Sequence, residues 1–148
     1  MNVVALKPAS ADPRIVRALV AVSKQTRATL GIRLADIGLA TGEDDVILAM
    51  RDGKPVCTAV LSLKLGVRET TMQRLMDQLV AHGHVEPADT PLFRLSRKGV
   101  DALADVAALR ARLASDVEAM LGVEAVAKLT EYLETLETGF AHSLRSTV

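Results

Sequence analysis

Hydrogen-bonding side chains gather in the first half of residues 70–81, a segment whose apolar residues have helical spacing. These apolar residues recur three and four positions apart, as on the buried side of a helix: Met72, Leu75, Met76, Leu79 and Val80. The polar residues of its first half are Thr70, Thr71, Gln73 and Arg74. Arginine can make two hydrogen bonds to guanine or contact a phosphate, and glutamine can make two hydrogen bonds to adenine. The segment predicts a helix that contacts double-stranded DNA, and the alternative is an ordinary solvated helix surface.

The flanking segments predict the elements that would position this helix. Before it, a short helix is expected from Thr58, as its cap, to Leu65, with Gly66 as the terminator. After it, residues 84–86 and 92–95 predict the two strands of a hairpin with a short connection. A helix, a turn, a second helix and a hairpin follow each other in a winged helix-turn-helix, where the second helix enters the major groove of DNA.

Three basic residues at the end of the hairpin and one threonine before the DNA-contacting helix add candidate contacts to the DNA backbone. Arg94, Arg97 and Lys98 could contact phosphates, or could simply lie at a solvated strand end and helix start. Thr58 could donate a hydrogen bond to a phosphate, although capping its own helix is sufficient reason for its presence. The sequence leaves both interpretations open for these four residues.

The remaining chain predicts long helices at both ends. Asp12 and Pro13 are typical of a helix start, and Gly38 is typical of a helix end. A long helix is expected from Ser96, as its cap, to Gly122. In the last helix, apolar residues are spaced alternately three and four positions apart, as in a coiled coil: Val126, Leu129, Leu133, Leu136 and Phe140.

These terminal helices predict a homodimer. The residues expected at its interface are Ile15, Val16, Leu19, Leu129, Leu133, Leu136 and Phe140. The alternative is that the last helix packs only on its own chain. We therefore expect a mainly α fold, with a helical dimerisation region at residues 12–38 and 100–144 and a winged helix-turn-helix DNA-binding module at residues 41–99, which has a short β-hairpin wing.

The net charge is zero, but the charges are unevenly distributed. Residues 1–33 carry six basic residues and one acidic residue, whereas residues 100–148 carry four basic and eight acidic residues. This asymmetry favours attraction between the first and last helices, within one chain or between two. Residues 41–99 carry eight charges of each sign, so a basic surface for DNA must come from local placement.

The composition argues against catalysis and against a metal site. The histidines, acidic residues and single cysteine do not occur at the spacing of metal ligands, and no cofactor is expected. Serine, histidine and acidic residues form no recognisable pair of nucleophile and base, so we expect no enzyme. Cys57 is interpreted as a buried structural thiol, and the alternative is a redox switch in a thiol-based oxidant sensor.

The sequence also predicts a cytoplasmic protein. No apolar stretch approaches the roughly 18 residues of a membrane span, and residues 1–11 lack the continuous apolar stretch of a signal peptide. A chain of 148 residues is long enough for one domain with its own core.

With these elements placed, the chain resembles the MarR family of winged-helix transcriptional regulators over about residues 12–144. The third of the matching segments corresponds to the recognition helix of the family, and the last two bracket its wing. In chain order, the segments are Leu30 to Leu39 followed by Thr41, Leu61 to Val67, Thr70 to Leu79, Gly83 to Val85, and Leu95 to Gly99.

The resemblance implies a dimeric DNA-binding transcriptional regulator. Such a dimer would place its two recognition helices roughly 34–36 Å apart on a pseudo-palindromic promoter site, and it would act as a repressor. The resemblance also implies a small-molecule effector, often an aromatic anion, which Arg14, Arg17 and Arg27 could meet. The other interpretation is a winged-helix dimer that has lost DNA binding and acts as a protein-interaction adaptor.

Two departures from the family pattern affect the predicted site. Arg68 and Glu69 stand where the family starts its recognition helix with a serine, so the usual cap is missing. Both are candidate DNA contacts. Glu69 can accept a hydrogen bond from the amino group of cytosine, but its negative charge also repels phosphate. Between Val85 and Leu95 the wing is several residues short, and the Asp-Arg-Arg tip of the family has no counterpart, which leaves minor-groove contacts open.

Overall fold

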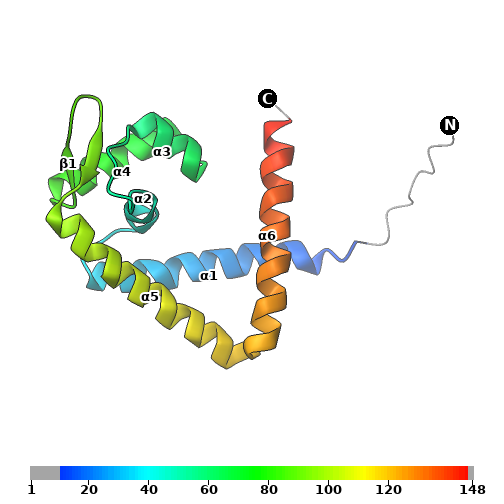
Figure 1. Ribbon diagram of the computed structural model, residues 1–148. Coiled ribbons are helices and arrows are strands. Elements are labelled where there is room, and N and C mark those ends of the chain that lie inside the picture. The colour runs from blue at the N-terminus through cyan, green and yellow to red at the C-terminus, as the bar shows by residue number, and fades with distance from the viewer. Residues whose placement is uncertain (1–10, 147–148) are drawn as a thin grey trace. The chain divides into compact units, whose positions relative to one another are not determined.

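The computed structural model describes residues 11–146 and is mainly helical (Figure 1). Its elements are α1 (Arg14–Asp36), α2 (Glu43–Ala49), α3 (Thr58–Leu65), α4 (Glu69–Ala81), β1 (Val85–Pro87), β2 (Phe93–Leu95), α5 (Arg97–Leu121) and α6 (Val123–Arg145). This order confirms the predicted mainly α winged helix-turn-helix fold. Residues 1–10, which belong to the segment predicted to lack a signal peptide, lie outside the described residues.

The chain divides into two compact units, with the boundary between Leu103 and Ala104 inside α5. The first unit contains α1 to α4, the hairpin and the start of α5, and the second contains the rest of α5 and α6. The limits expected for the dimerisation region and the DNA-binding module remain predictions. Within residues 11–146, no helix combines the length and the apolar character that a membrane span requires.

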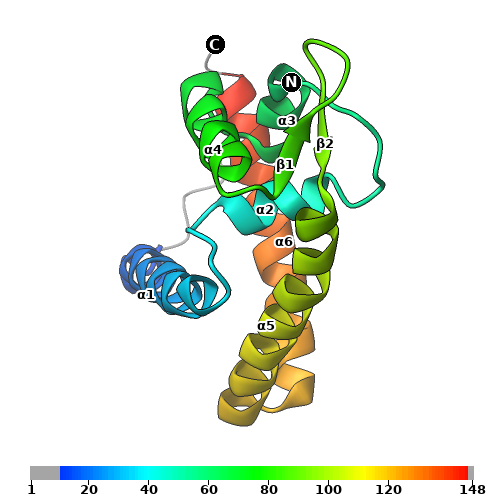
Figure 2. The same cartoon turned by 90° about the vertical axis from the view of Figure 1, so that its left-hand side faces the viewer.

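A small apolar core forms where α2, α3, α4 and β1 contact one another in the first unit (Figure 2). Its buried side chains include Val46, Ile47, Met50, Leu61, Met72, Leu75, Met76, Leu79 and Val85. Four of the five residues in the predicted apolar stripe of α4 are therefore buried, and the fifth, Val80, is half-buried. Full burial of a leucine or methionine side chain contributes about 1.5–3 kcal/mol, so this stripe determines which face of α4 points inward.

Helix α3 begins differently from the prediction. The expected cap, Thr58, is the first helical residue, and the preceding Cys57 is the N-cap with an extended backbone. No side chain caps this helix. The segment before α3 is bridged to the hairpin: the Val56 N–H donates to the Phe93 carbonyl at 2.9 Å, and the Phe93 N–H donates to the Val56 carbonyl at 2.8 Å. The bridge keeps the chain extended up to Cys57, and the first helical hydrogen bond then runs from the Leu61 N–H to the Cys57 carbonyl at 3.2 Å. Helix α3 therefore begins directly after the bridge and one position earlier than predicted.

The hairpin and the start of α5 agree with the sequence within about one residue. Strands β1 and β2 are antiparallel, with Glu86 opposite Arg94. Each strand has three residues, so the wing is short, as predicted. Ser96 caps α5 as expected, because its Oγ accepts a hydrogen bond from the Gly99 N–H at 3.1 Å.

The second unit leaves most of its apolar side chains exposed. Helix α6 has no buried residue, although its sequence is strongly amphipathic. The predicted interface residues Leu129, Leu133, Leu136 and Phe140 are all exposed, and Phe140 has 60% of its surface accessible. In the first unit, Ile15 and Val16 on α1 are also exposed, and Leu19 is half-buried. Apolar side chains predicted to contact a partner are thus uncovered in the single chain.

Candidate nucleic-acid interface

The polar side of α4 is the centre of the candidate site. The exposed residues at its N-terminal end are Arg68, Glu69, Thr70, Gln73 and Arg74, whereas Thr71 is half-buried. Arg68 precedes the helix with an extended backbone, and no side chain caps α4. The predicted absence of a side-chain cap is therefore confirmed. Of the six residues predicted on this helix start, five are exposed and Thr71 is turned partly towards the core.

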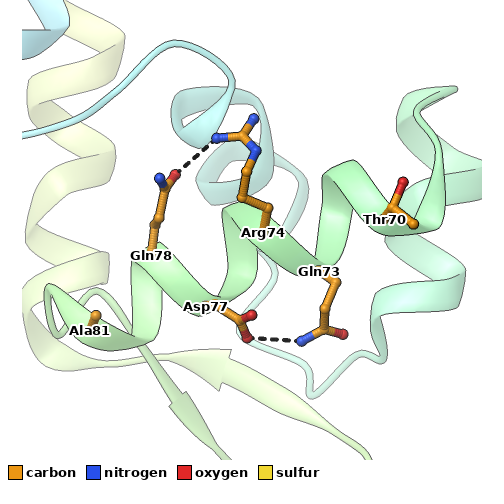
Figure 3. Close-up of a pocket in the computed structure, with 6 residues that line it drawn as sticks. All are labelled: Thr70, Gln73, Arg74, Asp77, Gln78 and Ala81. Atoms are coloured by element: carbon orange, nitrogen blue, oxygen red, sulfur yellow. Dashed lines mark hydrogen bonds between the residues drawn. The ribbon is translucent and has the colours of Figure 1, made fainter.

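Two side-chain pairs join successive turns along this side of α4 (Figure 3). The Gln73 amide nitrogen donates to Asp77 Oδ1 at 2.9 Å, and Arg74 Nη1 donates to Gln78 Oε1 at 3.3 Å. Both pairs have the i, i+4 spacing at which helical side chains meet. A shallow pocket runs along the same side of α4. We call this side the polar face of α4, and the residues that line the pocket are Thr70, Gln73, Arg74, Asp77, Gln78 and Ala81.

Asp77 and Gln78 are absent from the residues that the sequence predicted for the site. Their signal was available, because each lies four positions after a predicted DNA contact. What the spacing could not reveal is which polar atoms face each other, and this depends on the side-chain conformations.

The arginine on the wing is paired with an acidic neighbour. Arg94 Nε donates to Glu86 Oε1 at 2.8 Å, and both side chains are about half exposed. The two residues are directly opposite in the hairpin register, which brings their side chains to the same side of the sheet. Arg97, one turn before Asp101 on α5, lies 3.6 Å from its carboxylate. Both arginines predicted to add positive charge at the end of the wing therefore have an acidic neighbour.

Lys98 is exposed, and its ammonium group contacts the end of α4. Its Nζ donates to the His82 carbonyl at 2.7 Å, where a positive charge also complements the negative end of the α4 dipole. The Ser96 hydroxyl donates to the Gly83 carbonyl. The Ser96 N–H donates to the His84 carbonyl at 3.0 Å. The short segment before α5 thus attaches the hairpin to the end of α4.

Gly99 completes this attachment because the backbone there is too close for a side chain. A Cβ atom at Gly99 would collide with the His84 carbonyl oxygen. Part of the segment that resembles the MarR family, Leu95 to Gly99, therefore has a packing role in this chain, independent of any contact with DNA.

Two ionisable side chains of the first unit are buried outside the polar face of α4. His84 and Glu43 are both almost inaccessible, and neither His84 Nδ1 nor Glu43 Oε1 has a hydrogen-bond partner. Burial lowers the pKa of His84, and the positive charge of Lys98 adds to this effect, while the carboxylate of Glu43 opposes it. The other oxygen of Glu43 accepts from the Ala40 N–H at 2.8 Å, which holds the loop before α2.

The remaining predicted residues are placed less favourably. Thr58 is half-buried in the first turn of α3, and Cys57 is a half-buried free thiol beside it. On α1, Arg14, Arg17 and Arg27 are exposed, but Arg14 is paired with Asp12 at 2.7 Å, which lowers the pKa of that carboxyl. In the part of the chain that the structure describes, no three histidine, cysteine or acidic residues cluster as metal ligands would.

Solved structures with the same arrangement identify the fold. A MarR family protein from Mycobacterium tuberculosis in complex with DNA is 20% identical, with a TM-score of 0.72 over 84% of this chain and 98% of that chain. A mutant MarR from E. coli complexed with operator DNA is 21% identical, with a TM-score of 0.74 over 84% of this chain and 94% of that chain. This chain has the MarR winged-helix fold.

The same MarR fold also occurs in a transcriptional regulator from Thermotoga maritima. That protein is 22% identical, with a TM-score of 0.57 over 89% of this chain and 98% of that chain. No protein-family model matches the sequence, and no curated protein matches it. The MarR fold is therefore shared with proteins whose sequences differ from this one at most positions.

Proposed function

We propose that the chain is a MarR-family transcriptional regulator that binds double-stranded DNA through the polar face of α4, and that it is not an enzyme. One observation carries the proposal. The apolar side of α4 is buried in the core, and the opposite side leaves Gln73 and Arg74 exposed at the N-terminal half of the helix. This is the half of a recognition helix that contacts base edges in the major groove.

The solved neighbours add support for a nucleic-acid partner. Two of the proteins that share this fold were solved with DNA, one of them with operator DNA. Donors and acceptors on a helix surface suit the edges of bases, because each base pair presents its own pattern of donors and acceptors in the major groove.

The functional molecule in this proposal is a homodimer in the cytoplasm. Ile15 and Val16 on α1, with Leu133 and Phe140 on α6, expose apolar surface that a second copy would cover. Two-fold symmetry would present two copies of α4 about one DNA turn apart, roughly 34–36 Å, to a pseudo-palindromic promoter site. Occupation of such a site would block RNA polymerase, which makes repression the proposed outcome.

A small anionic effector completes the proposal. Arg17 and Arg27 are exposed on α1 and are suited to such a ligand. Arg14 is less available, because its guanidinium already makes several hydrogen bonds to Asp12.

The second candidate is a winged-helix adaptor that binds proteins instead of DNA. The observation that favours it is that basic side chains at the wing already have partners: Arg94 is paired with Glu86, and Lys98 donates to the His82 carbonyl. Glu69 adds an exposed negative charge near the start of α4. Both candidates share the fold and differ in whether the polar face of α4 contacts DNA.

A DNA-binding titration distinguishes the two candidates. Fluorescence anisotropy with duplexes from the promoter regions of the native genome, at two salt concentrations, should give an affinity that falls steeply as salt rises, because phosphate contacts release counterions. Arg74→Ala should weaken binding by about 1–3 kcal/mol if the side chain contacts a base.

Arg112→Ala is the matched control, since Arg112 is an exposed arginine on α5 in the other unit. It removes the same charge and should change the affinity much less. Absence of salt-dependent DNA binding by the unmodified protein would favour the adaptor. Equal losses for Arg74→Ala and Arg112→Ala would remove the polar face of α4 from the proposal.

A further inference from the structure

The hydrogen bond between Gln73 and Asp77 determines how the Gln73 amide is presented. Asp77 is exposed on the polar face of α4, one turn after Gln73, and its Oδ1 accepts from Gln73 Nε2 at 2.9 Å. Figure 3 shows that the amide nitrogen of Gln73 faces Asp77 and that the amide oxygen points away from it. The two ends of the Gln73 amide therefore have different surroundings.

The chemistry of the two groups makes this orientation the favourable one. An ionised carboxylate only accepts hydrogen bonds, whereas a primary amide has an oxygen that accepts and a nitrogen with two hydrogens to donate. Rotation of the Gln73 amide by half a turn would place its oxygen against the carboxylate of Asp77. That arrangement loses a charge-assisted hydrogen bond and adds repulsion between two acceptors.

One donor and one acceptor of Gln73 remain after this hydrogen bond forms. The free atoms are Oε1 and the second hydrogen on Nε2. Adenine presents the complementary pair in the major groove, a donor at N6 and an acceptor at N7, and glutamine satisfies both at once. Guanine presents two acceptors there, which the Gln73 amide in this orientation does not match.

We propose that Asp77 is a positioning residue that fixes the Gln73 amide for recognition of adenine in the major groove. This inference rests on the proposed function, because it requires the polar face of α4 to contact DNA. An acidic side chain on that face also repels phosphate. Asp77 thus lowers the general affinity for DNA while it raises the selectivity for one base.

The arginine of the second pair on the same face needs no such positioning. Arg74 Nη1 donates to Gln78 Oε1 at 3.3 Å, but a guanidinium has five N–H donors and no acceptor. Whichever way it turns, Arg74 presents donors, so its preference for guanine or phosphate does not depend on its neighbour. Of the two residues predicted to contact bases, Gln73 and Arg74, it is Gln73 whose selectivity depends on an adjacent side chain.

The test measures base selectivity with full-length protein and a pool of DNA duplexes in which the bound positions are randomised. Bound duplexes are sequenced for the unmodified protein, Asp77→Asn, Gln73→Ala and the double variant. Asparagine has nearly the same size as aspartate, but it can donate or accept, so it accommodates both orientations of the Gln73 amide. We expect Asp77→Asn to reduce the preference for adenine at one position of each half-site by about three- to ten-fold.

Asp89→Asn is the charge-matched control, because Asp89 is exposed in the hairpin loop of the same unit. Both single substitutions remove one negative charge and should strengthen binding to DNA in general. Asp89→Asn should leave the base preference unchanged. In the Gln73→Ala background, Asp77→Asn should no longer change selectivity, since the effect acts through Gln73.

The outcomes separate this inference from the proposed function. If the unmodified protein selects a sequence but Asp77→Asn keeps the same base preference, the positioning role is wrong and the DNA-binding proposal stands. The same conclusion follows if Asp77→Asn changes selectivity equally in the Gln73→Ala background. If the unmodified protein retains no duplex from the pool, both the proposed function and the inference fail.

Discussion

Helices α4 and α6 are both amphipathic, yet the apolar side is buried in α4 and exposed in α6. In α4, Met72, Met76 and Leu79 are fully buried against the rest of the first unit. In α6, no residue is buried, and Leu133 keeps 44% of its surface accessible. The surface that α4 leaves free is polar, whereas α6 leaves apolar side chains exposed. The proposed function accounts for this difference, because it gives α4 a polar partner, DNA, and α6 an apolar partner, a second copy of the chain.

The largest expected effect tests the buried side of α4. Met76→Ala removes a fully buried side chain and should lower the free energy of unfolding by about 2–5 kcal/mol, because it loses apolar burial and leaves a cavity. Gln73→Ala, an exposed substitution on the same helix, should change the free energy of unfolding by no more than about 0.5 kcal/mol. Urea unfolding followed by circular dichroism measures both. Similar losses for the two variants would contradict the difference between the two sides of α4.

The exposed side of α6 is tested through association. Leu133→Asp should raise the dissociation constant of the proposed homodimer by about 30-fold or more, since it places a charge among the exposed apolar side chains of α6. Thr135→Asp adds the same charge on another side of α6 and should change association much less. Sedimentation equilibrium over a range of protein concentrations gives both constants. If the unmodified protein is a monomer at all concentrations, the proposal that a second copy covers the apolar side of α6 is wrong.

A smaller effect, on DNA affinity, is expected at the wing, which would contact the same DNA as α4. Glu86→Gln removes the carboxylate that pairs with Arg94, so the arginine becomes available for a phosphate. DNA affinity should rise by about two- to five-fold, and the salt dependence should steepen by about one phosphate contact. Anisotropy titrations at several salt concentrations measure both quantities. Glu118→Gln on α5 removes the same charge from the second unit and should leave the salt slope unchanged.

The smallest expected effect is the pH dependence of stability that comes from His84. This residue lies where the hairpin is attached to the end of α4, and its carbonyl accepts from the Ser96 N–H. Burial holds the pKa of His84 below its usual 6.5 in the folded protein. Between the lowered pKa and that usual value, the unfolded chain binds more protons than the folded chain, so the free energy of unfolding should fall as the pH drops below about 6.5. Urea unfolding at pH 8 and at pH 5.5, compared with His84→Gln, tests this contribution. An unchanged pH dependence in His84→Gln would show that His84 is not its source.

The sequence predicted the order of the elements and the inward side of α4 because both are encoded locally. The spacing of Met72, Leu75, Met76 and Leu79 selects one side of a helix wherever the helix packs. Gly66 and Gly83 mark turns, and both have positive φ angles that glycine adopts without strain. Ser96 caps α5 as its type and position indicate.

Contacts between distant segments could not be predicted in the same way. Val56 pairs with Phe93 across the fold, and α3 begins directly after this bridge, with Cys57 and not Thr58 as its N-cap. Lys98, expected to be available for phosphate, donates instead to the His82 carbonyl. Arg94 meets Glu86 only because the hairpin register places them opposite each other. In each case the partner lies many positions away or depends on a strand register.

The sequence by itself determined that residues 70–81 would form a helix with one apolar and one polar side, because periodicity is a property of neighbouring residues. It also determined that residues 84–95 would return as a hairpin before α5. Only the tertiary structure decided which charged side chains remain available, because folding determines which carboxylate or carbonyl comes within hydrogen-bonding distance of a lysine or arginine. For the same physical reason, the atoms of Gln73 that face outward were settled by the conformation of Asp77 and not by the order of residues.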